Sequence, residues 1–108
     1  MSAKDVVAAV KAAGLPVAHV AWPVGSAPAL PWCVYLIDED GKLSADDSRW
    51  CSLTRWSVEL YSKQGDEESA PKLEAALTAA FGDYSKEETW VESESCVMTS
   101  YLFTEIGD

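Results

Sequence analysis

Basic residues are scarce in this chain of 108 residues, and long apolar runs are missing. The chain has 8 lysines and arginines against 18 acidic residues, and its formal net charge is −10 at pH 7. That charge disfavours binding to duplex DNA or to an anionic membrane surface, because both are negatively charged. No apolar run approaches the roughly 18 residues of a membrane-spanning helix, and the amino terminus has no signal-peptide pattern. We therefore expect no membrane partner.

Reactive side chains are few and scattered. Cys33, Cys51 and Cys96 have no CxxC spacing and are odd in number, so we expect reduced thiols that pack as small apolar residues. The single histidine, His19, would have to meet one of these thiols to form a nucleophilic dyad, and a partly exposed strand residue is the simpler interpretation. The six glycines are isolated, which excludes a glycine-rich phosphate loop. We therefore expect no enzyme, no cofactor and no metal site.

Apolar residues make up 48% of the chain, which is enough to form a folded core. The length fits a single domain over residues 1–108. Tryptophan is unusually frequent, and each of the five lies in or beside a predicted strand. Two interpretations stay open for them: large core residues, or anchors of a protein–protein interface. The five are Trp22, Trp32, Trp50, Trp56 and Trp90.

Two segments have the periodicity of amphipathic helices. The first spans residues 2–13, carries three valines on one face and ends at Gly14, which favours the left-handed backbone of a helix end. The second spans residues 67–81, and either Asp66 or Ser69 can cap it. Its predicted buried stripe consists of Ala70, Leu73, Ala76, Leu77, Ala80 and Phe81.

The remaining periodic segments are typical of strands. They span residues 17–22, 32–37, 50–63, 87–93 and 96–106. The second is apolar on both faces, which predicts a central, covered strand, and the third alternates so that one face is wet. The acidic run 38–41 ends in glycine and predicts a turn rather than a calcium loop. This order, α-β-β-β-α-β-β, predicts an α+β fold, with two helices packed on a mainly antiparallel sheet of about five strands.

Several stretches together resemble one known family. They are Gly14-Leu15-Pro16-Val17 followed by His19; Pro28-Ala29-Leu30-Pro31 leading into Trp32-Cys33-Val34-Tyr35-Leu36; Ala45-Asp46-Asp47; Trp56-Ser57-Val58-Glu59-Leu60-Tyr61-Ser62-Lys63; and Glu92-Ser93-Glu94. This pattern covers nearly the whole chain. It is similar to that of the small tail-completion proteins of long-tailed phages and prophages, also called tail-terminator or head–tail joining proteins. The chain departs from the family where the first proline of the loop pair is displaced to Pro28.

The resemblance implies a structural protein. Family members are α+β domains that assemble as a ring, typically a hexamer, at the head-proximal end of the tail tube, where the ring ends tube polymerisation. The implied partners are further copies of the chain, the tail-tube protein and the head connector protein, with DNA only as passing, unbound cargo. The implied location is the virion tail, and the cytoplasm of a bacterial host during assembly.

Acidic residues concentrate in residues 55–108, where 4 basic residues stand against 12 acidic ones. In a ring, part of this charge would line the lumen and repel passing DNA, and the candidate lumen residues are Glu87, Glu88, Glu92 and Glu94. A closed ring also needs a head-to-tail interface, for which the polar loop 39–48 and an exposed sheet edge are candidates. The candidate contact residues are Asp40, Lys42, Asp46, Asp47 and Trp50.

Two other functions fit the composition less well. The charge suits an acidic inhibitor that mimics DNA, although the neutral segments 17–37 and 50–60 do not. The tryptophans suit a small ligand-binding module with an aromatic pocket.

Overall fold

The computed structural model describes residues 3–22, 28–44 and 50–107. Its helices are α1 (Ala3–Ala12) and α2 (Ser69–Phe81), and its strands are β1 (Val17–His19), β2 (Trp32–Ser44), β3 (Trp50–Ser62), β4 (Ser85–Val91) and β5 (Cys96–Gly107). A single 3₁₀ turn, Glu92–Glu94, joins the last two strands. The predicted α+β class and element order are confirmed.

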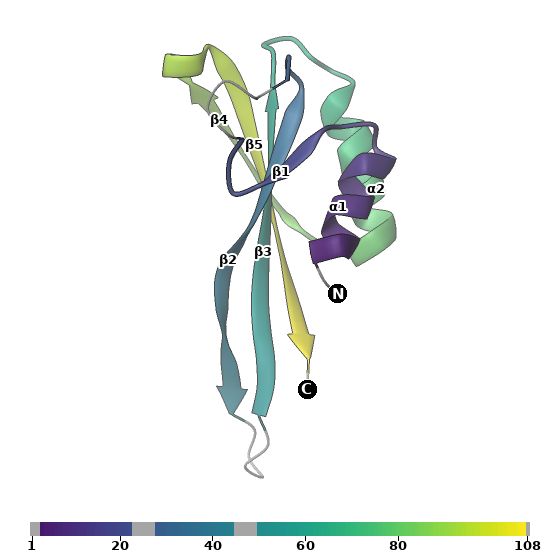
Figure 1. Ribbon diagram of the computed structural model, residues 1–108, viewed down its shortest axis with the longest axis vertical. Coiled ribbons are helices and arrows are strands. Elements are labelled where there is room, and N and C mark those ends of the chain that lie inside the picture. The colour runs from purple at the N-terminus through teal and green to yellow at the C-terminus, as the bar shows by residue number, and fades with distance from the viewer. Residues whose placement is uncertain (1–2, 23–27, 45–49, 108) are drawn as a thin grey trace.

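The described strands form one sheet in the order β1-β2-β3-β5-β4. β1 pairs with β2 in parallel, and every other neighbouring pair is antiparallel. Both helices pack on the same face of this sheet, side by side (Figure 1). We call the opposite face the helix-free face.

The hydrophobic core lies between the two helices and the sheet. Val10 of α1 and Leu77 of α2 are fully buried against Val58 and Leu60 of β3. These four side chains leave water on folding, and burial of each aliphatic side chain contributes about 1.5–3 kcal/mol. The core is therefore the main source of stability, and it holds both helices on one side of the sheet.

Helix ends follow the sequence closely. Gly14 has a φ of +80° and ends α1 as predicted. α2 begins at Ser69 rather than residue 67. In the turn before it, the Asp66 carboxylate accepts hydrogen bonds from the backbone amides of Glu68 and Ser69. Ala80, predicted to be buried, is exposed, because it lines the open groove between α1 and α2.

β1 is shorter than predicted, because the chain turns sharply at Val20. The backbone amide of Ala21 donates to the carbonyl of His19 at 2.7 Å, and Val20 has a φ of +66°. This tight turn ends the strand at His19. The predicted alternation of residues 17–22 is therefore wrong beyond His19.

Replacing Val20 by glycine is expected to raise the free energy of unfolding by about 0.5–1 kcal/mol. A positive φ costs an L-residue about 1–2 kcal/mol, and glycine loses part of that gain through its extra freedom in the unfolded chain. The Val20 side chain is 58% exposed, so little packing is lost. Urea unfolding measures the change. Ala21→Gly is the control. Ala21 does not have a positive φ, so this change should lower the free energy of unfolding.

The acidic segment 38–41 is part of β2, so the predicted turn is wrong. β2 continues to Ser44, and its pairing with β3 resumes at Glu39, opposite Arg55, after a register shift of the bulge type. The long β3 strand offers backbone partners along this whole stretch. Such pairing outweighs the local turn preference of the sequence.

Three strands extend beyond the helices as a narrow arm (Figure 1). We define the arm as Glu39–Ser44 of β2, Trp50–Arg55 of β3 and Thr104–Gly107 of β5, which are joined by continuous pairing. The arm makes the molecule long, with principal extents of 51 × 28 × 23 Å and a radius of gyration of 15.1 Å. A compact domain of this size has a radius of gyration of about 13 Å.

Candidate interaction surface

The helix-free face carries an unusual number of large side chains. Side chains alternate between the two faces of a strand. Because Cys33, Val58 and Tyr101 belong to the helix-covered core, their neighbours along the strands lie on the helix-free face. The side chains placed there by this alternation are Trp32, Val34, Leu36, Ser57, Glu59, Tyr61, Met98, Ser100 and Leu102.

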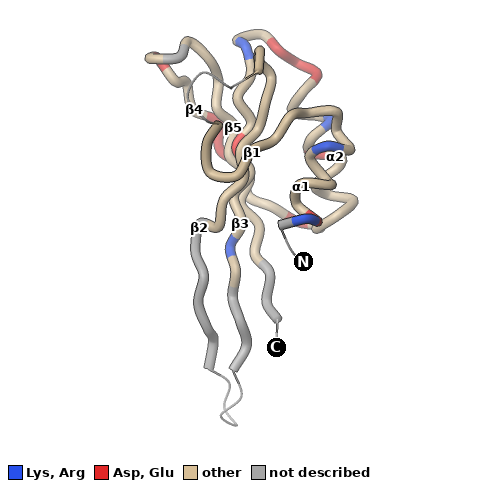
Figure 2. The backbone as a smooth tube through the Cα atoms, viewed as in Figure 1, with Lys and Arg blue, Asp and Glu red and all other residues tan. Residues whose placement is uncertain are grey.

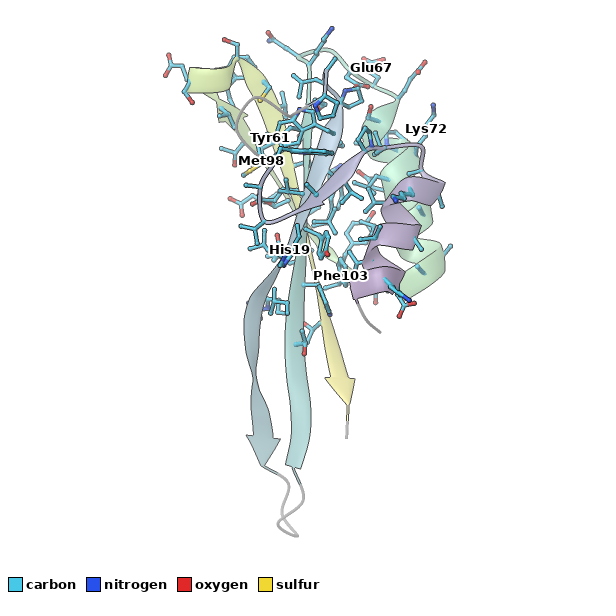
Figure 3. All side chains as sticks on the ribbon, viewed as in Figure 1. His19, Tyr61, Glu67, Lys72, Met98 and Phe103 are labelled. Carbon is cyan, nitrogen blue, oxygen red and sulfur yellow. The ribbon has the colours of Figure 1, made fainter. Side chains whose placement is uncertain are left out.

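Aromatic rings pack against one another at one end of this face. Trp32 stacks on Tyr61, with ring centroids 4.5 Å apart, and Trp22 meets Trp32 edge-on at 6.2 Å. Met98 stands opposite Tyr61 in the β3–β5 register, as Figure 3 shows. Offset and edge-on aromatic pairs stabilise by about 0.5–1.5 kcal/mol beyond their buried area, so this cluster gives the face a rigid aromatic end.

The rest of the helix-free face mixes apolar and polar side chains, of which Val34 and Ser57 are buried. Leu36 and Leu102 flank Ser57 across three strands, and both leucines stay half-buried. The prediction of a strand covered on both sides at 32–37 holds at Val34, which is 3% exposed on the helix-free face, but not at Leu36, which is half-buried. The wet face predicted for 50–63 is also partly wrong, since Ser57 is only 4% exposed.

The candidate lumen glutamates do not form a single patch. Lys86 of β4 reaches Glu74 of α2 at 2.7 Å, so Lys86 lies on the helix-covered side. By strand alternation Glu88 shares that side, and Glu87 lies on the helix-free one. Both are exposed, as is Glu92 in the turn after β4, and Figure 2 marks the described acidic residues in red. The side chain of Glu94 lies outside the described part.

The candidate inter-subunit residues fall on or beside the arm. Asp40 pairs with Thr54, and Lys42 with Ser52, while Trp50 begins β3 opposite Ser44. These are backbone positions, because the side chains concerned are outside the described part. Asp46 and Asp47 lie entirely outside the described residues. The structure thus assigns Asp40, Lys42 and Trp50 to paired strands, as predicted for Trp50 but not for Asp40 and Lys42, where a loop was expected.

A polar cluster ties α2 to the sheet on the covered side. The Tyr101 hydroxyl donates to Glu74 Oε2 at 2.8 Å, and Lys86 Nζ lies 2.7 Å from the same oxygen. Desolvation opposes ionisation of Glu74, but the hydrogen bonds from Lys86 and Tyr101 outweigh it and lower the pKa of this carboxyl. Burial, with the bond to Glu74, raises the pKa of Tyr101 above its usual range. The cluster is built as a structural link.

A Cys–His dyad is not formed by His19 with either described thiol, Cys33 or Cys96, and the side chain of Cys51 lies outside the described part. The His19 ring is exposed and packs on Tyr35, with centroids 4.9 Å apart. Cys33 is fully buried, opposite Leu60, and burial raises the pKa of its thiol to about 12. A nucleophilic cysteine needs a lowered pKa and access to substrate, so Cys33 is an apolar core residue. Cys96 is also buried.

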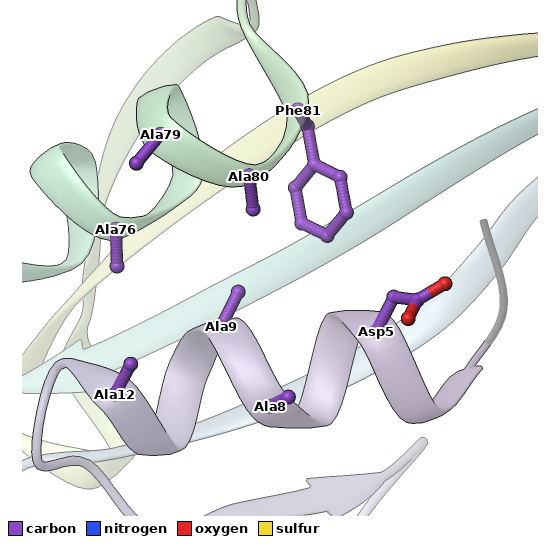
Figure 4. A pocket seen from close by; sticks show the side chains of 8 residues that line it. All are labelled: Asp5, Ala8, Ala9, Ala12, Ala76, Ala79, Ala80 and Phe81. Atoms are coloured by element: carbon purple, nitrogen blue, oxygen red, sulfur yellow. The ribbon is translucent and has the colours of Figure 1, made fainter.

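A groove of about 740 Å³ runs between α1 and α2 (Figure 4). Its lining is almost entirely methyl groups, from Ala8, Ala9 and Ala12 of α1 and from three alanines of α2, with Phe81 and the carboxylate of Asp5 at one end. A lining with so few polar groups gives a small polar ligand little to bind. It does not provide the tryptophan-lined pocket of the ligand-binding alternative.

Two further properties concern the described residues alone. No three metal-ligating side chains gather there in a way that would hold an ion. Neither described helix has the length and apolarity needed to cross a membrane.

Comparison with known proteins leaves the family open. A scan of the sequence against models of protein families found no match, and a search of curated proteins found none either.

Proposed function

We propose that this protein is a tail-completion protein of a long-tailed phage or prophage. It assembles as a ring at the head-proximal end of the tail tube, where it ends polymerisation and joins the tail to the head. Its partners are further copies of itself, the tail-tube protein and the head connector protein. DNA crosses the lumen without binding, and the protein is located in the virion tail after assembly in the host cytoplasm.

One observation carries this proposal furthest. The chain builds a three-stranded arm that projects beyond its own core, and it leaves the stacked rings of Trp32 and Tyr61 half-buried on the helix-free face. Projecting strands and half-exposed aromatic clusters are features that protein assemblies use, since an isolated domain gains little stability from them. Together with the sequence resemblance, they favour a protein that acts by association.

The charge of the chain is consistent with a DNA conduit. Each copy has a formal charge of −10, and Glu92, in the turn after β4, is exposed. A negatively charged wall repels phosphate, so DNA slides past without being held. A DNA mimic is favoured less, because Glu87 and Glu88 lie on opposite sides of β4 and do not form one extended acidic face.

Imaging of tail ends tests the proposal. Purified protein is mixed with cognate tail tubes made without it, and negative-stain images are compared with those of tubes alone. We expect a cap at one end only and an end to further elongation. Tubes that stay uncapped at both ends, or that bind the protein along their sides, contradict the proposal.

Neutralising Glu92 and Glu94 together (Glu92→Gln and Glu94→Gln) is expected to slow DNA delivery and leave tail assembly intact. The lumen would lose two negative charges per copy, so DNA would interact with its wall more strongly. Particle counts measure assembly, and the rate of DNA ejection or infection measures delivery. Glu67→Gln with Glu68→Gln, two exposed residues before α2, is the matched control. Unchanged delivery in the Glu92 and Glu94 variant argues against an acidic lumen there.

A further inference from the structure

The arm has two sheet edges that lack a strand partner in the described part of the chain. β1 pairs with β2 only as far as Tyr35, so the outer edge of β2 is open from there to Ser44. β4 pairs with β5 only between Cys96 and Leu102, so the outer edge of β5 is open from Phe103 to Gly107. Each open edge presents a row of backbone donors and acceptors, which is a template for pairing with another chain.

The ladder pattern indicates which groups on the β2 edge point outward. Cys33 donates to Pro16, and Tyr35 accepts from Val20, so odd-numbered residues of β2 turn their backbone groups outward before the bulge. The register shift between Ile37 and Glu39 adds one residue and reverses this order. Asp40 and Lys42 therefore direct their backbone N–H and C=O groups away from β3.

The same reasoning applies to the β5 edge. Leu36 and Ser57 direct their backbone groups toward each other, so Ser57 faces β2. Trp56, which precedes Ser57 in β3, therefore directs its backbone groups toward β5. Trp56 pairs with Phe103, and the following residue of β5, Thr104, therefore points outward. Ile106 points the same way, because backbone direction alternates along a strand.

Resting on the ring proposed above, we infer that the outer edge of β5 in one copy pairs in parallel with the outer edge of β2 in the next copy. β2 and β5 run in the same direction, since each is antiparallel to β3. The two edges also lie at the same level, because Thr104 and Glu39 both stand opposite Arg55, and Gly107 and Lys42 both stand opposite Ser52.

This geometry fits a second copy of the chain better than another partner. The β2 and β5 edges run in the same direction and lie at the same level. One copy can therefore be brought onto the next by a rotation without a shift along the axis, as a closed head-to-tail ring requires. Pairing of β2 with β2, or of β5 with β5, would instead be antiparallel and would stop at a dimer. The open β2 edge is longer than that of β5, so the pairing can shift along it to match the stagger of a closed barrel.

The charge of the chain sets the conditions of assembly. Each copy has a formal net charge of −10, so ring closure brings negatively charged copies together. At low ionic strength this repulsion opposes ring closure, and salt screens it over distances beyond about 3 Å at 1 M. The pairing therefore predicts an association that strengthens as salt rises.

A proline at Thr104 tests the pairing. Thr104→Pro removes an outward N–H and places a ring on the open edge, while the ladder with β3 keeps its hydrogen bonds. Thr104→Ala, which retains the N–H, is the matched control. Sedimentation velocity of the full chain is measured for all three proteins between about 0.05 and 1 M NaCl, with circular dichroism to verify that each is folded.

We expect the wild-type chain and Thr104→Ala to form one closed oligomer of defined size at high salt. Thr104→Pro should associate at least about tenfold more weakly, and Asp40→Pro, which blocks the opposite edge, should do the same. The inference is overturned if both proline variants associate as strongly as the wild type. It is also overturned if the wild type stays monomeric at high salt or forms nothing larger than a dimer. If the wild type caps tail tubes and the proline variants associate as strongly as it does, the edge pairing is refuted and the proposed function is not.

Discussion

Raising the pH above 9 is expected to destabilise the folded protein steeply, because the Cys33 thiol resists ionisation in the core. Cys33 is fully buried, and its pKa is raised from 9.0 to about 12. Between these values the unfolded chain releases the thiol proton and the folded chain keeps it. The free energy of unfolding therefore falls with rising pH across this window, and the full stability is present below pH 9.

The size of this effect follows from the shift. Three pH units correspond to a loss of about 4 kcal/mol for one group, which is a large part of the 5–15 kcal/mol of a small domain. Tyr101 acts in the same direction, because burial raises its pKa above the usual range as well. The loss from both groups grows as the pH passes 10.

Urea unfolding followed by tryptophan fluorescence, at intervals from pH 7 to 11, measures this loss. Cys33→Ala is the matched variant: it is less stable at pH 7 because it leaves a small cavity, and its stability should decline less steeply above pH 9. A stability that stays flat to pH 11, or an equal decline in Cys33→Ala, would contradict the assignment of the effect to this thiol.

Replacing Leu77 by alanine is expected to lower the free energy of unfolding by about 3 kcal/mol. The side chain is fully buried in the core, and removing it loses transfer free energy and leaves a cavity between α2 and the sheet; comparable changes elsewhere cost about 2–5 kcal/mol. For a domain of this size the melting temperature should fall by roughly 10 °C or more.

Thermal and urea unfolding of Leu77→Ala test this expectation. Thr78→Ala, at the exposed next position of the same helix, controls for helix propensity and should change the stability by less than about 0.5 kcal/mol. If the two variants are equally stable, α2 does not pack on the sheet through Leu77.

The candidate surface was only partly foreseeable from sequence. Residues 32–37 are apolar on both faces, which predicted a strand covered on both sides, but the pattern alone cannot say whether a helix, a loop or another molecule provides the cover. The sequence did not mark Met98, Leu36 or Leu102 as surface residues, since a half-buried strand residue cannot be told from a core residue by sequence alone. Their shared face exists only because β2, β3 and β5 are neighbours in the sheet.

The sequence by itself determined the two helices, the strand-forming segments and the α+β class. Those depend on local signals, such as the valine and leucine spacing of the helices and the stop at Gly14. Tertiary structure decided the length of β2. The run from Asp38 to Gly41 carries turn residues, but β3 pairs with it residue by residue, and partner hydrogen bonds outweigh a weak local preference. The arm and its open edges arise from that pairing, which depends on contacts between segments distant in the chain.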